Sequence, residues 1–261
     1  MPIDLNDSQL ERYSRQILLP QVDQTGQSRL LDSHVIIVGV GGLGSPAAIY
    51  LACSGIGKLT ICDADRVELN NLQRQIALQT TDIGKLKTES AKKHLLTLNP
   101  DIDIQTVAER VNENNVSALL RKADCVIDAS DNFTTRYILN RTSFIENKPL
   151  VSGSAIRMQG QVSVFNATPK SPCYQCLYPQ LSQSQGLNGS CSDAGVLSPL
   201  VGIIGSVMAT ETLKILLNIG ESLDGYLLTL NAETMAWKRL SLEKDPHCPT
   251  CGGHTLSKTM L

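Results

Sequence analysis

A glycine-rich turn between an expected strand and an expected helix constrains the fold of this chain more than any other feature. The apolar, β-branched run His34-Val-Ile-Ile-Val-Gly39 is typical of a strand buried on both faces. Small residues over 45–54 then favour a helix. The turn has the G-x-G-x-x-G spacing, which lets the backbone approach phosphates at the N-terminus of that helix. It predicts a nucleotide site at Gly39, Gly41, Gly42 and Gly44.

The alternation of strands and helices predicts the fold class. After residues 8–31, which look helical, strands are expected over 58–63, 102–107, 124–128 and 150–154, with helices over 85–98, 115–121 and 132–147. Antiparallel strands are expected over 161–165, 226–231 and 235–242, after a long loop over 169–193. The pattern predicts an α/β, Rossmann-like doubly wound sheet, parallel at first and mixed toward the C-terminus. We expect a single domain over 1–261, with a helical arm (1–33), a nucleotide-binding half (34–155) and a second half (156–261).

Charge and hydropathy argue against nucleic-acid and membrane partners. The 261 residues include 23 basic and 25 acidic side chains, so the net charge of -2 gives no general attraction to polyanions. The longest apolar stretch, 194–219, contains Glu211 and Lys214 and has no uninterrupted run of about 20 apolar residues, so it reads as a buried helix. The polar N-terminus does not resemble a signal peptide. We therefore expect a cytoplasmic protein.

A cluster of polar residues follows the second expected strand. Asp63 ends that strand 24 residues beyond Gly39, where a carboxylate usually holds the ribose hydroxyls of a nucleotide. The stretch from Asp63 to Gln75 then gathers acids, amides and Arg74, whose planar fork suits phosphate oxygens. Lys87 begins the next helix and offers a second cation. A nicotinamide-dependent oxidoreductase shares the glycine turn but needs little of this cluster.

A further acid follows the fourth expected strand. Asp131 and Asn132 lie just beyond the strand ending at Asp128, where a doubly wound sheet has its ligand crevice. Carboxylate oxygens together with substrate phosphates are the ligands that Mg²⁺ prefers. The position predicts a magnesium site at Asp131.

Four of the eight cysteines form two Cys-x-x-Cys pairs. These are Cys173 with Cys176 and Cys248 with Cys251. Four thiolates complete a tetrahedral zinc site and leave no position for water, so the pattern predicts a structural zinc. A redox role for either pair is the alternative. The flanking His247 and His254 are further possible ligands, and we expect Cys53, Cys62 and Cys125 to be unreactive core residues.

Cys191 stands apart in a polar loop just before the apolar helix. Such a position favours exposure and a lowered thiol pKa, which are the conditions for reactivity. An unreactive loop cysteine is an equally good interpretation of the same residues. Both interpretations remain open from the sequence.

Five segments resemble one enzyme family. They are Arg12-Tyr-Ser-Arg15-Gln-Ile, Gly39-Val-Gly-Gly-Leu-Gly44, Asn71-Leu-Gln-Arg-Gln75, Asp131-Asn132 and Cys191-Ser-Asp-Ala-Gly-Val196. Together they look like the bacterial adenylyltransferases that activate ubiquitin-like sulfur carrier proteins for molybdopterin or thiazole synthesis, relatives of the ubiquitin-activating enzymes. The resemblance spans about residues 10–253. The Asn-Leu-Gln-Arg-Gln run is far more specific than the glycine turn.

The resemblance implies ATP, Mg²⁺ and Zn²⁺ as ligands and assigns roles to matching positions. Gly42 and Asp63 would hold adenosine, and Asp131 would hold Mg²⁺ beside Asn132. The phosphates would be lined by Asn70, Asn71, Leu72, Gln73, Arg74 and Lys87. Arg15 is expected to reach the site of a neighbouring subunit, which implies a homodimer. Cys191 would link to the carrier only in the thiazole branch.

The implied reaction is adenylation of the Gly-Gly carboxylate of the carrier, with release of pyrophosphate. The implied partners are that small carrier and a cysteine desulfurase or other sulfur donor. Two other functions remain open: an NAD(P)-dependent oxidoreductase, and a non-catalytic, zinc-stabilised interaction module. Exchange of labelled pyrophosphate into ATP separates the three, because only the first catalyses it.

Overall fold

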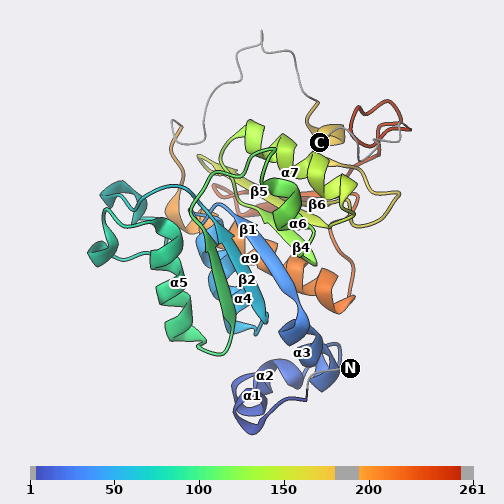
Figure 1. Cartoon of the computed structure of the whole chain (residues 1–261). Coiled ribbons are helices and arrows are strands. Elements are labelled where there is room, and N and C mark those ends of the chain that lie inside the picture. The colour runs from blue at the N-terminus through green and yellow to red at the C-terminus, as the bar shows by residue number, and fades with distance from the viewer. Residues whose placement is uncertain (1–3, 180–193, 254–261) are drawn as a thin grey trace.

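Eight strands form one mixed sheet in the computed structural model, which describes residues 4–179 and 194–253. The strand order is β3-β2-β1-β4-β5-β6-β7-β8. The first five are parallel, and β6, β7 and β8 each run antiparallel to the preceding strand (Figure 1). The strands are β1 (His34–Val38), β2 (Lys58–Cys62), β3 (Asp103–Val107), β4 (Cys125–Asp128), β5 (Leu150–Ile156), β6 (Gln159–Phe165), β7 (Tyr226–Asn231) and β8 (Ala236–Ser241). This confirms the predicted change from parallel to mixed pairing.

Helices cover both faces of the sheet, so strand β1 is buried on both sides. Val35 and Ile37 belong to one apolar core, whereas Ile36 and Val38 belong to the other. In the first core the sheet packs against α4 (Gly44–Cys53), α5 (Lys87–Leu98) and α9 (Ser198–Leu217). In the second it packs against α6 (Val116–Leu120), α7 (Phe133–Ile145) and α8 (Tyr174–Leu177) (Figure 1). The unbroken apolar run of β1 follows from this two-sided burial.

Helix α9 lies close against the sheet and the glycine turn. It is long and apolar enough to cross a bilayer by length and composition, but half of that window is buried inside the molecule. A Cβ atom on Gly160 of β6 would lie 2.6 Å from Ile204 of α9, and one on Gly205 would lie 2.4 Å from the Leu43 carbonyl oxygen. Glycine at both positions allows this approach, and the prediction of a buried helix is confirmed.

The N-terminal arm is three short helices rather than the single helical stretch expected over 8–31. They are α1 (Asp7–Arg12), α2 (Ser14–Ile17) and α3 (Asp23–Asp32). Pro20 interrupts the pattern because it cannot donate a backbone hydrogen bond inside a helix. The buried Tyr13 separates α1 from α2, and its hydroxyl accepts a hydrogen bond of 2.9 Å from the Asn99 side chain. The arm is therefore attached where α5 ends, below the amino ends of the parallel strands (Figure 1).

Two further expectations need correction. The segment expected as a loop over 169–193 contains helix α8, and residues 180–193 lie outside the described chain. Cys53 is exposed at the end of α4 rather than buried in the core. The expectation for Cys62 and Cys125 is correct, because burial raises the pKa of each thiol to about 12.

Replacing Gly44 by alanine should destabilise the protein by roughly 3 kcal/mol or more. The added Cβ atom would lie 1.9 Å from the Gly39 carbonyl oxygen, so the backbone must move. Gly202 in α9 is the matched control, because a Cβ atom there meets nothing within 4 Å. Gly202→Ala should stabilise by about 0.5–1 kcal/mol, the usual gain in a helix interior. Urea unfolding measures both, and equal stabilities for the two variants would contradict this account of the turn.

Candidate functional site

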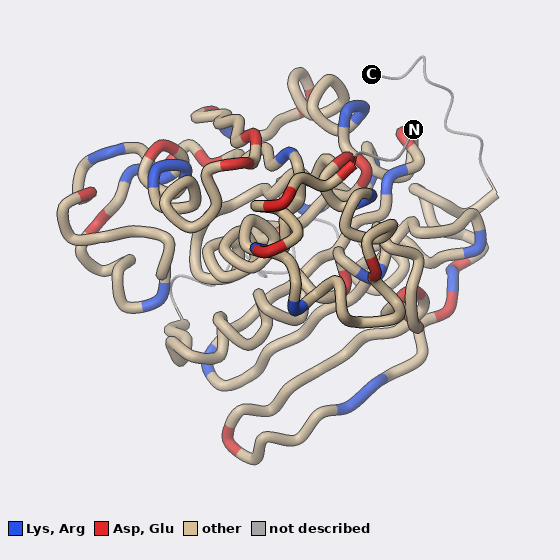
Figure 2. Tube along the Cα trace, turned by 90° about the horizontal axis from the view of Figure 1, so that it is seen from below, with Lys and Arg blue, Asp and Glu red and all other residues tan. Residues whose placement is uncertain are grey.

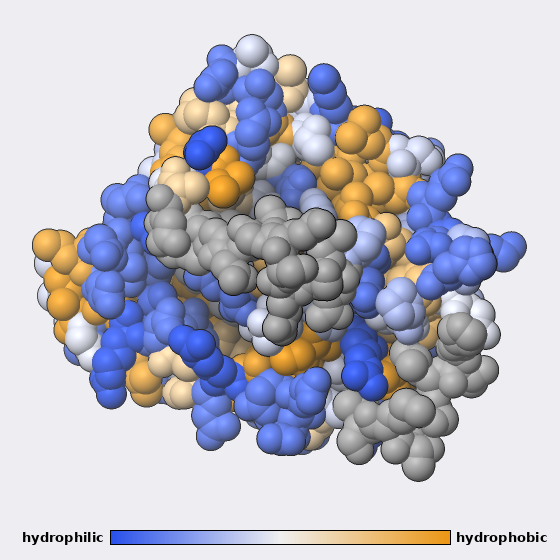
Figure 3. Space-filling model, turned by 90° about the horizontal axis from the view of Figure 1, so that it is seen from above, coloured by the Kyte–Doolittle hydropathy of each residue, from blue (hydrophilic) through white to orange (hydrophobic). Residues whose placement is uncertain are grey.

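A cavity of about 770 Å³ opens where β1 and β4 end. These neighbouring strands lead into connections that run to opposite sides, so the crevice is the switch point at which such sheets bind ligands. Nine of the residues predicted to bind nucleotide line it: Gly39, Gly41, Gly42, Asp63, Gln73, Arg74, Lys87, Asp131 and Asn132. Figure 3 views the molecule from this side, where hydrophilic and hydrophobic residues lie next to each other.

The glycine turn forms the floor of the cavity. Gly39 has a φ of +88°, and a Cβ atom there would lie 2.7 Å from the Ala129 carbonyl oxygen. Gly44 packs on Gly39 and does not line the cavity. At Gly41, by contrast, the nearest atom to an added Cβ is 3.7 Å away. The missing side chain of Gly41 therefore keeps space open for a ligand, whereas Gly39 and Gly44 serve the shape of the turn.

Asp63 holds the turn from the end of β2. Its Oδ2 accepts a hydrogen bond of 2.9 Å from the Val40 backbone N–H, and its Oδ1 accepts one of 2.9 Å from that of Asp65. Burial raises the pKa of the Asp63 carboxyl, while the nearby charge of Lys87 opposes that shift. The Asp63 carboxylate is thus already hydrogen-bonded to the turn, and a bound nucleotide would share this carboxylate with the turn.

Lys87 is the one lysine among the described residues that line the cavity. Its Nζ lies 3.0 Å from Oδ2 of Asp65, and the two side chains are 8% and 58% exposed. The Asp65 carboxylate is largely in water and loses little on separation, whereas the buried Lys87 ammonium needs another anion in its place. Lys87 can therefore exchange Asp65 for an incoming phosphate oxygen.

The Asn-Leu-Gln-Arg-Gln run divides between the cavity and the scaffold. Gln73 and Arg74 line the cavity, and Nη1 of Arg74 donates 2.9 Å to the Asn70 carbonyl oxygen. Asn70, Asn71 and Leu72 are not among the residues that line it. Asn71 instead caps the short 3₁₀ helix Leu69–Asn71 by accepting a hydrogen bond of 3.1 Å from the Glu68 backbone.

Asp131 and Asn132 occupy the turn between β4 and α7. Both are exposed, and both line the cavity. Asn132 is also the N-cap of α7, because its Oδ1 accepts a hydrogen bond of 2.9 Å from the Thr135 backbone. Oδ1 of Asp131 accepts a hydrogen bond of 3.3 Å from Nδ2 of Asn132, and the Asp131 side chain is otherwise exposed to solvent. Its carboxylate is therefore available to a cation.

Sequence reasoning missed several residues of the cavity wall. Gln75 is 4% exposed, lines the cavity, and its Oε1 has no hydrogen-bond partner in the described part of the chain. Arg136 and Ser130 line it from the β4–α7 region, and residues 109–112 line it from the segment after β3. Gln75 is the last residue of the Asn-Leu-Gln-Arg-Gln run. A glutamine in such a run can be a buried ligand contact or a surface residue, and the residue type alone does not distinguish the two.

Arg15 lies far from this cavity in its own chain. It is exposed on α2, and the neighbouring Gln16 donates 3.2 Å to the Ser54 carbonyl oxygen between α4 and β2. That is the amino edge of the sheet, opposite the cavity (Figure 1). Cys191 falls outside the described residues, so its two interpretations both stay open.

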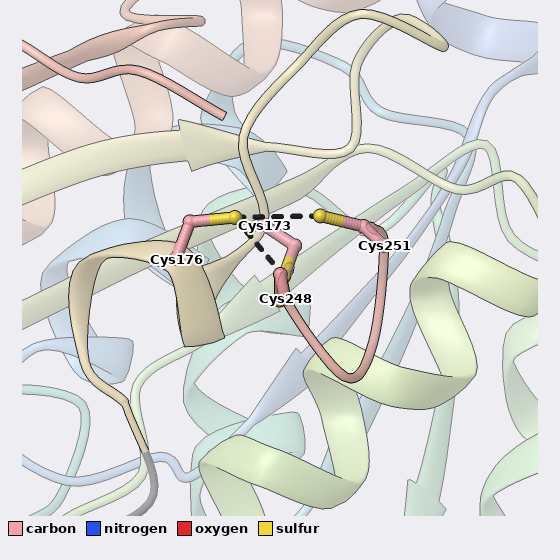
Figure 4. Close-up of side chains that lie close together, drawn as sticks. All are labelled: Cys173, Cys176, Cys248 and Cys251. Atoms are coloured by element: carbon pink, nitrogen blue, oxygen red, sulfur yellow. Dashed lines mark hydrogen bonds between the residues drawn. The ribbon is translucent and has the colours of Figure 1, made fainter. Parts of the chain in front are cut away.

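The four predicted zinc ligands come together in a second site. The side chains of Cys173 and Cys176 at α8 meet those of Cys248 and Cys251 near the C-terminus, and all four sulfurs lie within 4.8 Å of one another (Figure 4). Three of the sulfur pairs are 3.3, 3.5 and 3.9 Å apart, so the cysteines are not disulfide-bonded. Zn–S bonds of about 2.3 Å in a tetrahedron place sulfurs about 3.8 Å apart, which this cluster fits.

The zinc cluster lies apart from the cavity but touches α7. Nδ2 of Asn140 donates 3.6 Å to Sγ of Cys173, and Oδ1 of Asn140 accepts 2.8 Å from the Tyr174 backbone. His247 contributes no atom to the cluster. A metal bound by these thiolates would join α8 and the C-terminal segment to the helix that begins at the cavity.

Charges of both signs are interspersed over the described chain. Figure 2 shows Lys and Arg scattered among Asp and Glu along the trace. The cavity is an example, because its lining contains Arg74, Lys87, Arg110 and Arg136 together with Asp63, Asp65, Glu109 and Asp131. The lining thus holds as many cations as carboxylates, and its attraction for an anion depends on where the individual cations lie.

Comparison with known proteins identifies relatives over nearly the whole chain. The model of the ThiF family matches residues 13–250. The sulfur carrier protein adenylyltransferase of Thermus thermophilus is 40% identical over 257 residues, which cover 97% of this chain and 94% of the relative. The molybdopterin-synthase adenylyltransferase of Escherichia coli is 42% identical over 250 residues, which cover 95% of this chain and 99% of the relative.

Solved structures share the same fold. The crystal structure of E. coli MccB with MccA-N7isoASN superposes with a TM-score of 0.83 and is 24% identical. The match covers 95% of this chain and 76% of that one. At this identity the likeness concerns the fold.

Removing metal should destabilise this protein strongly. We expect about one zinc per chain, and chelation should lower the melting temperature by roughly 10 °C or more, because structural zinc contributes directly to folding. Cys248→Ser should reproduce the loss, while Cys53→Ser, which alters an exposed thiol outside the cluster, should not. Calorimetry with metal analysis checks both. A metal-free protein with an unchanged melting temperature would contradict the zinc assignment.

Proposed function

This chain belongs to the ThiF family, and from that premise we propose that it adenylates the C-terminal Gly-Gly carboxylate of a ubiquitin-like sulfur carrier protein at the cost of ATP. Its relatives are adenylyltransferases, which are nucleotidyltransferases that act on such carriers. The activated carrier would accept sulfur for molybdopterin or thiamine thiazole synthesis. The observation that carries the proposal is the grouping of Arg74, Lys87 and Asp131 around one cavity at the carboxyl edge of the sheet.

The charges of the cavity favour a triphosphate over a nicotinamide cofactor. Arg74 offers a planar pair of donors to phosphate oxygens, and Lys87 offers a point charge after it leaves Asp65. Hydride transfer creates no comparable negative charge and does not need these groups. The oxidoreductase alternative and the non-catalytic alternative both leave the set of Arg74, Lys87 and Asp131 without a purpose.

The proposed reaction is a displacement at phosphorus. A carboxylate oxygen of the carrier bonds to the α-phosphorus, the bond from that phosphorus to the bridging oxygen breaks, and pyrophosphate leaves with that oxygen. The attacking group is already an anion, so the protein supplies no nucleophile. Arg74 and Lys87 hold and neutralise the phosphates in the aligned geometry. Asp131 would hold Mg²⁺, whose charge screens the phosphates.

Part of the cavity lining suits a tail without side chains. It consists of small or apolar residues, namely Ser154, Ala155, Gly195, Val196 and Val201. A Gly-Gly terminus fits between such walls, whereas bulkier residues would meet them. We assign the carrier-binding role to the half of the chain over 156–261 together with this wall. A cysteine desulfurase or other sulfur donor would then act on the adenylated carrier, with Cys191 as a candidate for covalent linkage to it.

A homodimer would complete the site with Arg15. Because Arg15 lies at the opposite edge of its own sheet, it reaches a cavity only in a second copy of the chain. Leu18 and Leu19 follow it in sequence and are 72% and 51% exposed, as expected for residues that a partner covers. We place this dimer in the cytoplasm, with zinc in the cysteine cluster as a structural ion.

Arg74→Ala should abolish most of the pyrophosphate exchange. Loss of one preorganised group that neutralises developing charge lowers such rates by about 10²–10³-fold. Arg66→Ala is the matched control, because Arg66 is an exposed arginine of the same segment that does not line the cavity. Exchange of labelled pyrophosphate into ATP in the presence of a Gly-Gly-ended carrier measures both variants. Normal exchange by Arg74→Ala would exclude the proposed phosphate site.

Mixed dimers should reveal whether Arg15 acts on the partner. Arg15→Ala and Arg74→Ala should each be inactive alone, but a hybrid dimer has one intact site, built from Arg74 of one subunit and Arg15 of the other. When equal amounts of the two variants assort at random, about half of the dimers are hybrids, and each hybrid has one intact site of two. The mixture should therefore restore about one quarter of the wild-type exchange. Dimers in which every subunit carries both substitutions provide the background rate of exchange. Recovery no greater than this background would contradict the action of Arg15 across subunits.

A further inference from the structure

A buried arginine ties the β4–α7 turn to strand β5. Arg136 of α7 is 6% exposed. Its Nη1 donates 3.0 Å to Oγ of Ser152, and its Nη2 donates 2.5 Å to the Ser130 carbonyl oxygen and 2.9 Å to that of Gly153. One guanidinium therefore connects α7 both to the turn and to strand β5.

An aspartate at the end of β4 balances this charge. Asp128 is completely buried, and its Oδ2 lies 3.5 Å from Nη1 of Arg136. Its Oδ1 accepts 2.6 Å from the Ser130 hydroxyl and 3.1 Å from the Ser130 backbone N–H, while Oδ2 accepts 3.1 Å from Ser152. Both members of the pair make several hydrogen bonds, which is the condition under which buried charges are tolerated.

The network fixes the residue that immediately precedes Asp131. Asp128 holds the N–H and the hydroxyl of Ser130, and Arg136 holds its carbonyl oxygen. On the other side of Asp131, Asn132 is fixed as the N-cap of α7. The Asp131 backbone is thus held on both sides, although its carboxylate is exposed.

The donors of Arg136 make a direct role in phosphate binding unfavourable. They point to protein acceptors, and the guanidinium also lies 5.9 Å from the centre of the Tyr174 ring on α8. Turning toward the cavity would leave Asp128 buried and unpaired, which costs several kcal/mol. A buried ion pair adds little stability over well-packed apolar residues, so stability alone does not account for it.

We propose that Arg136 is a positioning residue that, with Asp128 and Ser152, orients Asp131 toward a divalent cation at the cavity. This inference rests on the proposed function, because it concerns the metal that accompanies ATP. Removal of a residue that orients a metal ligand typically weakens metal affinity or activity by about 10–100-fold.

Arg136→Lys tests the proposal, because lysine keeps the charge opposite Asp128 but lacks the planar fork. The Mg²⁺ concentration for half-maximal pyrophosphate exchange should rise about tenfold or more, while the KM for the carrier stays within about twofold. A separate readout is the rise in melting temperature that ATP produces. In Arg136→Lys this rise should no longer depend on Mg²⁺ when the Mg²⁺ concentration is low millimolar. Ser152→Ala removes one hydroxyl of the network and should raise the Mg²⁺ requirement by a smaller factor, about threefold.

Glu211→Gln is the matched control for loss of a buried ion pair. Glu211 contacts Lys214 at 2.5 Å and is 4% exposed on α9, outside the cavity lining. It should lower the melting temperature without changing the Mg²⁺ requirement. If Arg136→Lys and Ser152→Ala respond to Mg²⁺ like the wild type or like this control, the positioning role is wrong. If the wild type itself catalyses no exchange, the proposed function fails instead, and the melting-temperature readout still decides whether Arg136 affects Mg²⁺ with ATP.

Discussion

The backbone contact between Gly44 and the Gly39 carbonyl oxygen determines the shape of the glycine turn, on which the floor of the cavity depends. A side chain on Gly44 would come within 1.9 Å of that oxygen, so only glycine lets helix α4 start this close to the end of β1. The close start turns the first backbone N–H groups of the helix toward the crevice. Asp63 then joins the turn to β2 through the Val40 N–H. The position of the backbone N–H groups of the turn therefore follows from one steric condition on the main chain.

Two ion pairs near the cavity differ in a way that suits different tasks. In the pair of Lys87 and Asp65 the carboxylate is 58% exposed, so water can replace the lysine beside it when the 8%-exposed lysine passes to an anionic ligand. In the pair of Arg136 and Asp128 the side chains are 7% and 0% exposed, so separating them would leave a buried charge. The first pair can exchange partners during a reaction cycle, whereas the second holds the shape of the site throughout. Solvent exposure of the acid makes the difference.

Local patterns in the sequence were sufficient for the parallel half of the fold and for much of the site. Gly39, Asp63 and Asp131 follow strand ends, and parallel strands bring their carboxyl ends to one edge, so their meeting was predictable. The cysteine spacing likewise predicted the cluster. Arg136 was not predictable, because its role depends on contacts with Ser152 and Gly153 of another strand. Cys53 was misjudged because helix periodicity alone does not tell which side of α4 faces solvent.

The cysteine cluster also changes the topology of the chain. A metal held by Cys173 and Cys251 closes a ring that contains α9, β7 and β8, whose residues include both a wall of the cavity and the edge of the sheet. Closing such a ring on folding costs conformational entropy, and this cost grows only slowly with ring length. Insertions within the ring would therefore cost little stability. The enclosed segments can therefore change in length while one end of the ring remains anchored beside α7.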